Sequence, residues 1–325
     1  MDIKMLDYVV MIAKCESISK AAEKLYLTQS GLNQQLLKLE RNLGIKLFER
    51  DHHHFRITDA GKIYVRNAME ILRIQRNTLM QLSDLKNNIH AEISIGLTHE
   101  HGIDLFTAVY PIFRHHYPYL RCKLAEHIVR DQYQLIEEGE LDIGIVLTNI
   151  NTAKCFPDLV FHEVYQEDLL LGIPMTHPMA KNAVPIGTAQ PLRVTDIHLF
   201  KDEPFSFSLI FEDSTMRKEV IDPMFEENQL HPIIMLETAI NTALTQIVGK
   251  GLSCTILPHS RVLSSPYRDD CAWFRLLDNP VWSVSIVHRK DYKLSKSIYD
   301  LIRLMDQYGQ KLEKIFLTES PGYLK

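Results

Sequence analysis

The sequence lacks long apolar runs and is poor in cysteine. No stretch approaches the roughly 20 consecutive apolar residues that a membrane-spanning helix requires, and Asp2, Lys4 and Asp7 stand where a signal peptide would have an apolar segment. We therefore expect a cytoplasmic protein with no membrane partner. The five cysteines are odd in number and form no C-x-x-C pair, so neither a disulfide framework nor a zinc knuckle is expected. Reduced, mostly buried thiols are expected at Cys15, Cys122, Cys155, Cys254 and Cys271.

The sequence also lacks the short motifs of common enzyme classes. It contains no G-x-S-x-G, no G-x-x-x-x-G-K-[ST] and no G-x-G-x-x-G, which disfavours hydrolases, nucleoside triphosphatases and dinucleotide-binding enzymes. His99, Glu100 and His101 have metal-binding side chains, but adjacent residues on a turn rarely converge on one ion. Cys254 and Cys271 are 17 residues apart and lack the features of a redox pair. We therefore predict no catalytic residue, no cofactor and no metal site.

Composition and charge distribution suggest a globular protein of several domains. Hydrophobic residues make up 46% and charged residues 24% of the 325 residues, which is ordinary for a chain that buries large cores, and the length is typical of two or three domains. The net charge of −5 is unevenly distributed, because residues 1–88 have a net charge of +4 and the remainder −9. This asymmetry suggests a polyanion as the partner of the N-terminal part alone.

Three helices are predicted within the first 44 residues. Apolar residues recur at i, i+3, i+4 and i+7 over 6–13, which predicts an amphipathic first helix. A short second helix is predicted near 20–25. Thr28 is a suitable N-cap for a third helix that runs to about Asn42 and ends before Gly44. Two short helices joined by a tight turn form a helix-turn-helix.

The predicted third helix has two contrasting faces. At 100° per residue, one face is an apolar core stripe of Leu32, Leu36, Leu39 and Leu43. The opposite face collects Ser30, Gly31, Gln34, Lys38 and Arg41, with Asn33 and Gln35 on its flanks. Short hydroxyls and amides near a helix N-terminus, followed by cations, suit contacts with base edges and phosphates in the major groove. This pattern favours a DNA-reading helix over a merely solvated one.

A β-hairpin and a long helix are predicted to follow. Two short apolar-alternating runs over 45–57 surround a polar tip, which is typical of a wing that points Arg50 and the histidines at 52–54 toward DNA. A long helix opens at Thr58. Along it a 4-3-4-3 spacing forms a heptad seam of Ala68, Leu72, Gln75, Leu79 and Leu82. Such a seam predicts pairing with a second copy of the same helix.

These N-terminal residues resemble the winged helix-turn-helix of LysR-type transcriptional regulators. The resemblance rests on Ala21, Ala22, Leu25, Gln29, Gln35, Leu39, Glu40, Leu43, Gly44, Leu47, Phe48, Arg50, Thr58, Ala60 and Gly61. The sequence departs from the family at Ser30-Gly31, where Pro-Ala is common, at Asn33, where Ser is common, and at 53–54, where arginines are common. These departures leave the operator sequence unpredicted. The residues predicted to contact DNA are Thr28, Gln29, Ser30, Gly31, Asn33, Gln34, Lys38, Arg41, Arg50, His53 and His54.

From residue 91 the pattern changes to alternating strands and helices. Strands are predicted at 93–97, 120–126 and 141–147, with helices near 101–117 and 131–138. This βαβαβ order predicts a parallel sheet. A second unit is predicted from the strand 168–173, a helix near 214–227, the strand 232–236, a helix to 248 and the run 252–257. A strand at 281–287 and a helix from 295 to about 308 are predicted to follow.

The second half also resembles the effector-binding half of the LysR family. The segments that recur in order are Leu169–Leu171 before Pro174, His177–Ala180, Asp202–Phe205, and Gly249–Leu252 before Leu257-Pro258. The resemblance implies two α/β lobes like those of a periplasmic binding protein, with a ligand between them. The expected parts are the winged helix-turn-helix domain at 1–57, the linker and dimerisation helix at 58–90, the effector-binding domain at 91–308 and a C-terminal tail at 309–325. Lobe one is expected at about 91–162 and 268–308, and lobe two at about 163–267.

Three strand ends are predicted to meet at the effector site, because ligands of open sheets bind beyond the carboxyl ends of the strands. The predicted effector-binding residues are Thr98, His99, Glu100, His101, Thr148, Phe205, Ser206 and Phe207. The three hydroxyls suit an oxyanion, and the two phenylalanines suit pocket walls. Glu100 fits that scheme poorly, since an acid suits recognition of an amine or tuning of the pKa of nearby imidazoles. The identity of the effector therefore stays open.

Two functions from different classes compete. The first is a sequence-specific transcriptional regulator that binds operator DNA, responds to a small molecule, forms a homodimer or homotetramer and contacts RNA polymerase. The alternative is a constitutive or architectural DNA-binding protein whose α/β half has no ligand. An enzyme with an attached DNA-binding domain is disfavoured, because the sequence shows no catalytic nucleophile with a general base to activate it. Whether the regulator activates or represses is not predicted.

Overall fold

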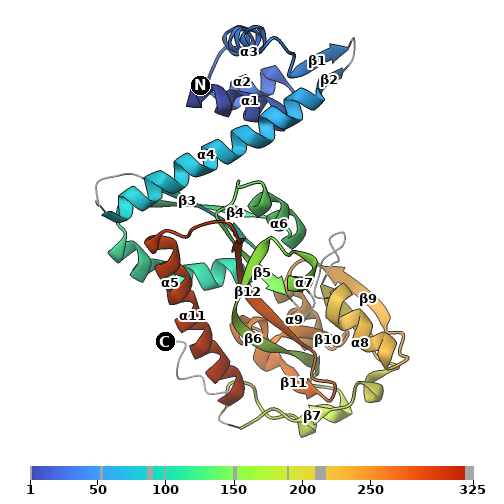
Figure 1. The fold of residues 1–325 in the computed structure, drawn as a ribbon. Helices are drawn as coiled ribbons and strands as arrows, with labels where there is room; N and C mark the ends of the chain where they lie inside the picture. The colour runs from blue at the N-terminus through green and yellow to red at the C-terminus, as the bar shows by residue number, and fades with distance from the viewer. Residues whose placement is uncertain are drawn as a thin grey trace.

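The N-terminal part of the chain folds as three helices and a β-hairpin. The structure is a computed structural model that describes residues 2–51, 54–85, 91–98, 100–148, 152–188, 190–208 and 217–318. The elements are α1 (Ile3–Cys15), α2 (Ile18–Lys24), α3 (Gln29–Leu43), β1 (Phe48–Asp51) and β2 (His54–Ile57). The two strands are antiparallel, and Val9, Ile12, Leu32, Leu36 and Leu47 are in the core. The predicted winged helix-turn-helix is confirmed (Figure 1).

One residue of the predicted core stripe of α3 is misplaced. Leu32 and Leu36 are buried, but the side chain of Leu43 is 45% exposed in the last turn of the helix. Gly44 ends α3 with a left-handed φ of 69°, as predicted, and Leu43 lies at the surface near Ile45 and Ile63. The prediction that Leu43 belongs to the core is therefore wrong.

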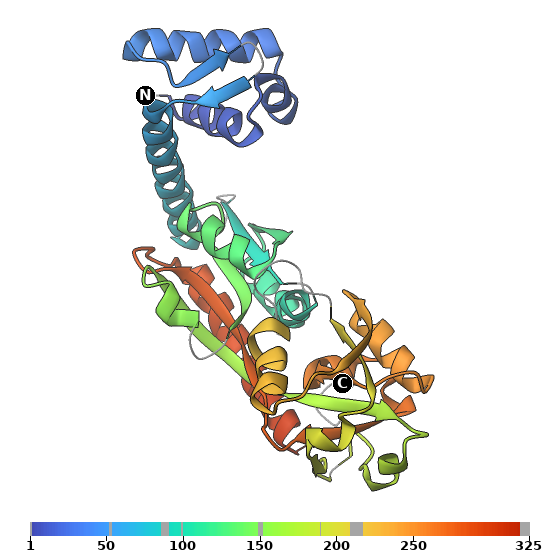
Figure 2. The same ribbon diagram turned by 90° about the vertical axis from the view of Figure 1, so that its right-hand side faces the viewer.

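A single long helix, α4 (Asp59–Leu85), links the DNA-binding part to the α/β half (Figures 1 and 2). Its first half packs on α1, where Ala68 is buried and Leu72 packs partly against Leu6 and Val10. Its second half packs on the α/β half, whose core includes Met80. Two of the five predicted seam residues thus pack within their own chain, whereas Leu79 and Leu82 are exposed.

The first lobe of the α/β half is built on a mixed sheet. Its strands are β3 (Ala91–Leu97), β4 (Leu120–Glu126), β5 (Ile143–Thr148), β12 (Val281–Arg289) and the first half of β6 (Leu159–Pro174), in the order β4-β3-β5-β12-β6. The pairs β3-β4 and β3-β5 are parallel, as predicted from the βαβαβ pattern, and β12 is antiparallel to both of its neighbours. The helices are α5 (His101–His116), α6 (Val129–Glu137), the short α7 (Thr152–Cys155) and α11 (Lys296–Thr318).

The second lobe is built around the other half of β6. This half pairs with β10 (Thr255–Pro258) and β11 (Cys271–Leu276), and β11 pairs with β7 (Val194–Thr195). A separate parallel pair consists of β8 (Pro204–Ser208) and β9 (Ile233–Thr238). The helices are α8 (Asp222–Glu227), α9 (Asn241–Gly249) and α10 (His259–Ser264). Because β6 belongs to both sheets, it crosses from one lobe to the other, and Figure 2 shows the two lobes along its length.

Two elements of the α/β half differ from the positions expected for them. Strand β11 pairs with the second-lobe half of β6, although residues from 268 onward were expected in lobe one. Helix α11 continues to Thr318 instead of ending near Tyr308, and Ile315 and Phe316 in its last turns are buried. Gly309 permits this course, since a Cβ there would lie 2.2 Å from the carbonyl oxygen of Val164. Among the described helices, none is long and apolar enough to cross a membrane.

Candidate DNA-binding surface and interlobe site

The N-terminus of α3 is fixed by its cap. The Oγ1 atom of Thr28 accepts a hydrogen bond from the backbone N–H of Gly31 at 3.2 Å and one from the hydroxyl of Ser30 at 3.4 Å. This arrangement satisfies one of the free N–H groups of the first turn and leaves others available to a phosphate. The predicted N-cap is therefore confirmed.

Most of the predicted DNA-contacting residues of α3 are exposed together. Gln34 and Lys38 lie one turn apart, and the guanidinium of Arg41 donates to the carbonyl oxygen of Leu37 at 3.2 Å. The exposed members are Thr28, Gln29, Ser30, Gln34, Lys38 and Arg41, and the half-buried ones are Gly31 and Asn33. The structure thus places these residues on an accessible helix surface.

Two exposed residues beside this surface were missed by the sequence analysis. Tyr26 is 95% exposed in the turn before α3, where its φ of 55° is left-handed. Leu37 is also exposed, one position before Lys38. An apolar side chain on a polar helix face could have been noticed from the sequence, whereas the exposure of Tyr26 depends on its unusual backbone conformation.

The wing is held against α3 by a carboxylate. The Oε1 atom of Glu40 accepts the backbone N–H groups of Leu47 and Phe48 at 2.8 and 3.1 Å, and the rings of Phe48 and Phe55 stack at 5.1 Å. These contacts fix the start of β1 relative to the recognition helix. The side chains of Arg50 and His54 lie outside the described part of the chain, and so does all of His53.

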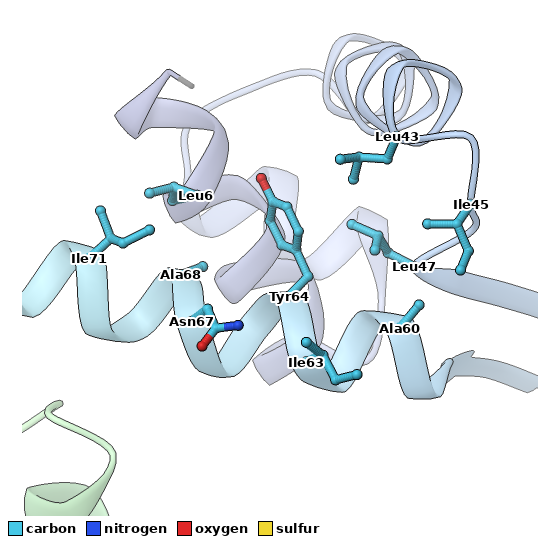
Figure 3. Close-up of a pocket in the computed structure, with 10 residues that line it drawn as sticks. All are labelled: Leu6, Leu43, Ile45, Leu47, Ala60, Ile63, Tyr64, Asn67, Ala68 and Ile71. Atoms are coloured by element: carbon cyan, nitrogen blue, oxygen red, sulfur yellow. The ribbon is translucent and has the colours of Figure 1, made fainter.

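An apolar groove lies between the end of α3 and the first half of α4 (Figure 3). It has a volume of about 290 Å³, and its rim includes the exposed side chains of Leu43, Ile45 and Ile63. The other lining residues are Leu6, Leu47, Ala60, Tyr64, Asn67, Ala68 and Ile71. Burial raises the pKa of Tyr64, whose hydroxyl has no hydrogen-bond partner among the described residues. The groove is therefore an apolar surface to which α1, α3 and α4 all contribute.

In the α/β half, two of the predicted strand ends lie side by side. The N–H of Thr98 donates to the carbonyl oxygen of Ile145 at 3.1 Å, which joins the ends of β3 and β5. The side chain of Thr98 is 5% exposed, and its hydroxyl has no hydrogen-bond partner within the described ranges. The hydroxyl of Thr148 lies 2.7 Å from that of Ser285 on the neighbouring β12. Of these two hydroxyls, the one on Thr98 is therefore the one left for a ligand.

The third predicted strand end is part of the second-lobe core. The rings of Phe205 and Phe207 are buried, stack at 5.4 Å and both meet the ring of Phe225 edge-on. The hydroxyl of Ser206 is fully buried and lies 2.7 Å from that of Ser253. This burial argues against the prediction that the two rings form pocket walls, because they pack against their own lobe.

His101 takes part in a buried polar cluster rather than facing a pocket. Its Nε2 atom lies 3.2 Å from Oε1 of Glu167. The same Oε1 atom accepts the indole N–H of Trp282 at 3.1 Å, and Oε2 of Glu167 accepts the backbone N–H of Ser260 at 2.7 Å. Burial by itself would raise the pKa of Glu167, but the hydrogen bond and charge of His101 and the donors of Ser260 outweigh it and lower that pKa. The sequence analysis missed Glu167, although an acidic residue directly before the apolar strand predicted at 168–173 was a visible signal.

Glu100 connects the two lobes. One oxygen of its carboxylate accepts the side-chain N–H of Asn241, at the start of α9, at 2.5 Å, and it lies 3.7 Å from the guanidinium of Arg261 on α10. The same guanidinium contacts Asp104 on α5 at 2.5 Å. His99, between Thr98 and Glu100, lies outside the described residues. First-lobe side chains therefore reach the second lobe from the turn before α5 and from the first turn of that helix.

Comparisons with known proteins agree with this architecture. Residues 3–62 match the family described as "Bacterial regulatory helix-turn-helix protein, lysR family", and residues 86–310 match the "LysR substrate binding domain". The chain is 27% identical over 260 residues to the Hca operon transcriptional activator HcaR of Escherichia coli (strain K12), covering 79% of this chain and 82% of that protein. It is 26% identical over 314 residues to a probable RuBisCO transcriptional regulator of Trieres chinensis, covering 95% and 92%.

Solved structures share the complete fold. A full-length OxyR variant from Pseudomonas aeruginosa has a TM-score of 0.65 and 21% identity, with coverage of 95% of each chain. Full-length CbnR in complex with its target DNA has a TM-score of 0.57 and 18% identity, with coverage of 94% of this chain and 99% of that one. At this level of identity the likeness concerns the fold.

Proposed function

The chain belongs to the LysR family of DNA-binding transcriptional regulators, which are not enzymes, and we propose that it binds operator DNA as a homodimer whose affinity or geometry responds to a small molecule held between its two lobes. The observation that carries the proposal is the combination, in one chain, of a capped and exposed recognition helix with a two-lobed α/β half. We also propose RNA polymerase as a partner. Because operator DNA and RNA polymerase are in the bacterial cytoplasm, we propose that the protein acts there.

The proposed DNA contacts follow from the exposed surface of α3. Gln34 and Lys38 are exposed on it, beyond the capped first turn. An amide near the N-terminus of a helix in the major groove contacts base edges, and a lysine one turn later contacts phosphate. Gln34→Ala should therefore relax sequence preference, whereas Lys38→Ala should weaken all DNA binding and reduce the salt dependence. Fluorescence anisotropy with operator and scrambled duplexes at several salt concentrations tests both.

The proposed dimer uses α4. Its exposed apolar residues include Leu79 and Leu82, which continue the predicted heptad seam, and Ile63 and Ile74, which lie on another side of the helix at 100° per residue. Burying Leu79 and Leu82 against a second copy is the usual way in which long helices with heptad spacing are stabilised. The groove of Figure 3 lies on the same helix and offers a second place for apolar side chains of the other copy. Assembly beyond the dimer is proposed to use the α/β halves.

The proposed effector site is supported by the unsatisfied hydroxyl of Thr98 beside the cross-lobe contact of Glu100. The alternative function, constitutive DNA binding without a ligand, makes a different prediction. A thermal-shift screen with common metabolites should find a stabilising compound if the protein is ligand-responsive, since a ligand at 100 times its Kd adds about 2.7 kcal/mol. If no metabolite stabilises the full chain, the constitutive function is favoured.

A further inference from the structure

The cross-lobe contact at the start of α5 contains more negative than positive charge. Two first-lobe carboxylates, Glu100 and Asp104, share the guanidinium of Arg261, which belongs to the second lobe. Arg261 lies much closer to Asp104 (2.5 Å) than to Glu100 (3.7 Å). The side chains of Arg261 and Glu100 are only 8% and 23% exposed, whereas that of Asp104 is 54% exposed, so water screens the charge of Glu100 less than that of Asp104. Glu100 is thus the less completely neutralised of the two carboxylates.

The other charged pair nearby does not supply the missing positive charge. His101 lies against Glu167, whose carboxylate is surrounded by donors from Ser260 and Trp282. That pair has its own partners and is buried. No further salt bridge to Glu100 is present in the described part of the chain.

Two buried polar atoms, one on Asn241 itself and one on the residue two positions before Glu100, lack partners. The hydroxyl of Thr98, two residues before Glu100, and the Oδ1 atom of Asn241, whose Nδ2 atom contacts Glu100, have no hydrogen-bond partner within the described ranges. The amide oxygen of Asn241 is only an acceptor, and a hydroxyl also accepts. Leaving buried acceptors unsatisfied is costly, so the position is suited to a group that donates several hydrogen bonds.

We propose that the effector carries a protonated amine, and that its ammonium group is bound by the carboxylate of Glu100, the amide oxygen of Asn241 and the hydroxyl of Thr98. An ammonium group has three N–H donors and one positive charge, which match three acceptors and one incompletely neutralised carboxylate. Thr98 and Glu100 come from the first lobe and Asn241 from the second. Binding of the amine therefore ties the two lobes together.

Other ligand chemistries fit these atoms less well. A carboxylate would face the carboxylate of Glu100 and would leave the amide oxygen of Asn241 without a donor. A divalent metal ion needs several oxygen or nitrogen ligands, and no group of three or more His, Cys, Asp or Glu side chains able to hold one occurs among the described residues. The charge and the hydrogen-bonding capacity both favour the amine.

The test uses the full chain and two matched sets of probes. One set contains the twenty standard amino acids, putrescine, spermidine and glucosamine, and the other contains carboxylic acids without an amine, such as succinate, benzoate and 3-phenylpropionate. Melting temperature is measured with each compound, and isothermal titration then gives the Kd of any compound that raises it. We expect at least one amine to raise the melting temperature and no amine-free acid to do so.

Variants then locate the binding site. Glu100→Gln keeps the shape and removes the charge, so the Kd of the amine should rise at least tenfold, and Thr98→Val should raise it severalfold. Glu226→Gln, on the exposed side of α8, is the matched control and should leave the Kd within twofold. If Glu100→Gln does not fold, the result for Thr98→Val decides alone. An amine whose Kd is unchanged in both variants binds elsewhere and overturns the assignment.

This inference depends on the proposed function, and the two fail differently. If only amine-free acids raise the melting temperature, and Thr98→Val weakens them, the effector site stands and the ammonium assignment is wrong. If no amine in the first set raises the melting temperature, the ammonium assignment is overturned. If neither set nor the wider metabolite screen has any effect, ligand responsiveness itself is overturned.

Discussion

The carboxylate of Glu70 on α4 lies 2.5 Å from the guanidinium of Arg289 on β12. This ion pair joins the helix that carries the DNA-binding part to the first lobe of the α/β half. The contact is reinforced by neighbours, because Arg289 also donates to the carbonyl oxygen of Glu137 at 2.8 Å and Glu70 accepts from Arg73. Asp84, further along α4, accepts the first N–H groups of α11 from Lys296 and Ser297. Helix α4 therefore acts as an extension of the first lobe.

The strength of this connection can be measured. A double-mutant cycle with Glu70→Gln and Arg289→Gln should give a coupling of up to about 1 kcal/mol in the free energy of unfolding, since both side chains are partly exposed. The coupling should fall at high salt because ions screen the pair. Urea unfolding of the full chain at low and high salt provides the measurement. The exposed pair Asp59 and Lys62, within α4, is the control and should show a smaller coupling. A coupling of zero at low salt would contradict a structural role for the ion pair.

The proposed dimer predicts a loss of assembly when charges enter the exposed apolar stripe of α4. Leu79 and Leu82 are 40% and 43% exposed, so Leu79→Glu with Leu82→Glu should leave the chain folded but place two carboxylates in the proposed interface. Light scattering should report monomers, and operator affinity should fall because two linked DNA-binding parts no longer act together. Leu277→Glu, at a 67% exposed position after β11, is the control. A dimer that survives the double substitution would place the interface elsewhere.

Local signals explain which parts of the fold were predictable. Thr28 and Gly44 bracket α3 because capping and a left-handed stop are decided within a few residues. The exposure of Leu43 was not predictable from periodicity, which gives a helix face but not how far the neighbouring helices extend along it. The true end of α11 was hidden for a related reason. Gly309 looks like a helix terminator in the sequence, but in the structure it allows close approach to Val164.

The candidate effector site shows the limit of sequence analysis more clearly. The position of Thr98 follows from the strand pattern, because a residue just beyond a parallel strand lies at a sheet edge. The partners of the neighbouring residues Glu100 and His101 do not follow from that pattern. Glu100 contacts Asn241, which is 141 positions away in the sequence, and His101 contacts Glu167, which is 66 positions away. The first pair depends on how the two lobes are oriented and the second on how α5 packs against β6, and neither composition nor spacing encodes these arrangements in a form that can be read directly.

The buried thiols predict insensitivity to oxidation. Burial raises the pKa of Cys254 and of Cys271 to about 12 and that of Cys122 to about 11, so these residues hold little of the reactive thiolate at neutral pH. We therefore expect hydrogen peroxide to leave operator affinity unchanged. Anisotropy measured before and after peroxide treatment tests this. Cys155 is exposed, so Cys155→Ser serves as the control for oxidation at the surface. A loss of affinity that persists when both Cys155 and the half-buried Cys15 are replaced by serine would contradict the prediction.

A buried histidine predicts a loss of stability in mild acid. His259 is fully buried, both of its ring nitrogens lack partners among the described residues, and its ring lies 5.0 Å from that of Phe316. Burial lowers the pKa of His259 to about 4, from the ordinary value of 6.5. The unfolded chain therefore binds the proton more tightly than the folded chain, so the free energy of unfolding is unaffected above pH 6.5 and decreases as the pH falls toward 4. The expected loss from this residue is about 2 kcal/mol at pH 5 relative to pH 7.5.

Replacement of His259 separates this effect from the titration of other groups. His259→Phe removes the proton-binding site and keeps an aromatic ring against Phe316, so unfolding by urea at pH 7.5 and pH 5 should show a smaller loss in the variant by about 2 kcal/mol. His115→Phe, at an exposed position on α5, is the control and should retain the acid sensitivity of the native protein. The pH dependence is the decisive quantity, because a change in packing alters stability equally at both pH values. The contrary outcome is that His259→Phe loses as much stability between pH 7.5 and pH 5 as the native chain. His259 would then not bind a proton preferentially in the unfolded state, and other groups would account for the acid sensitivity.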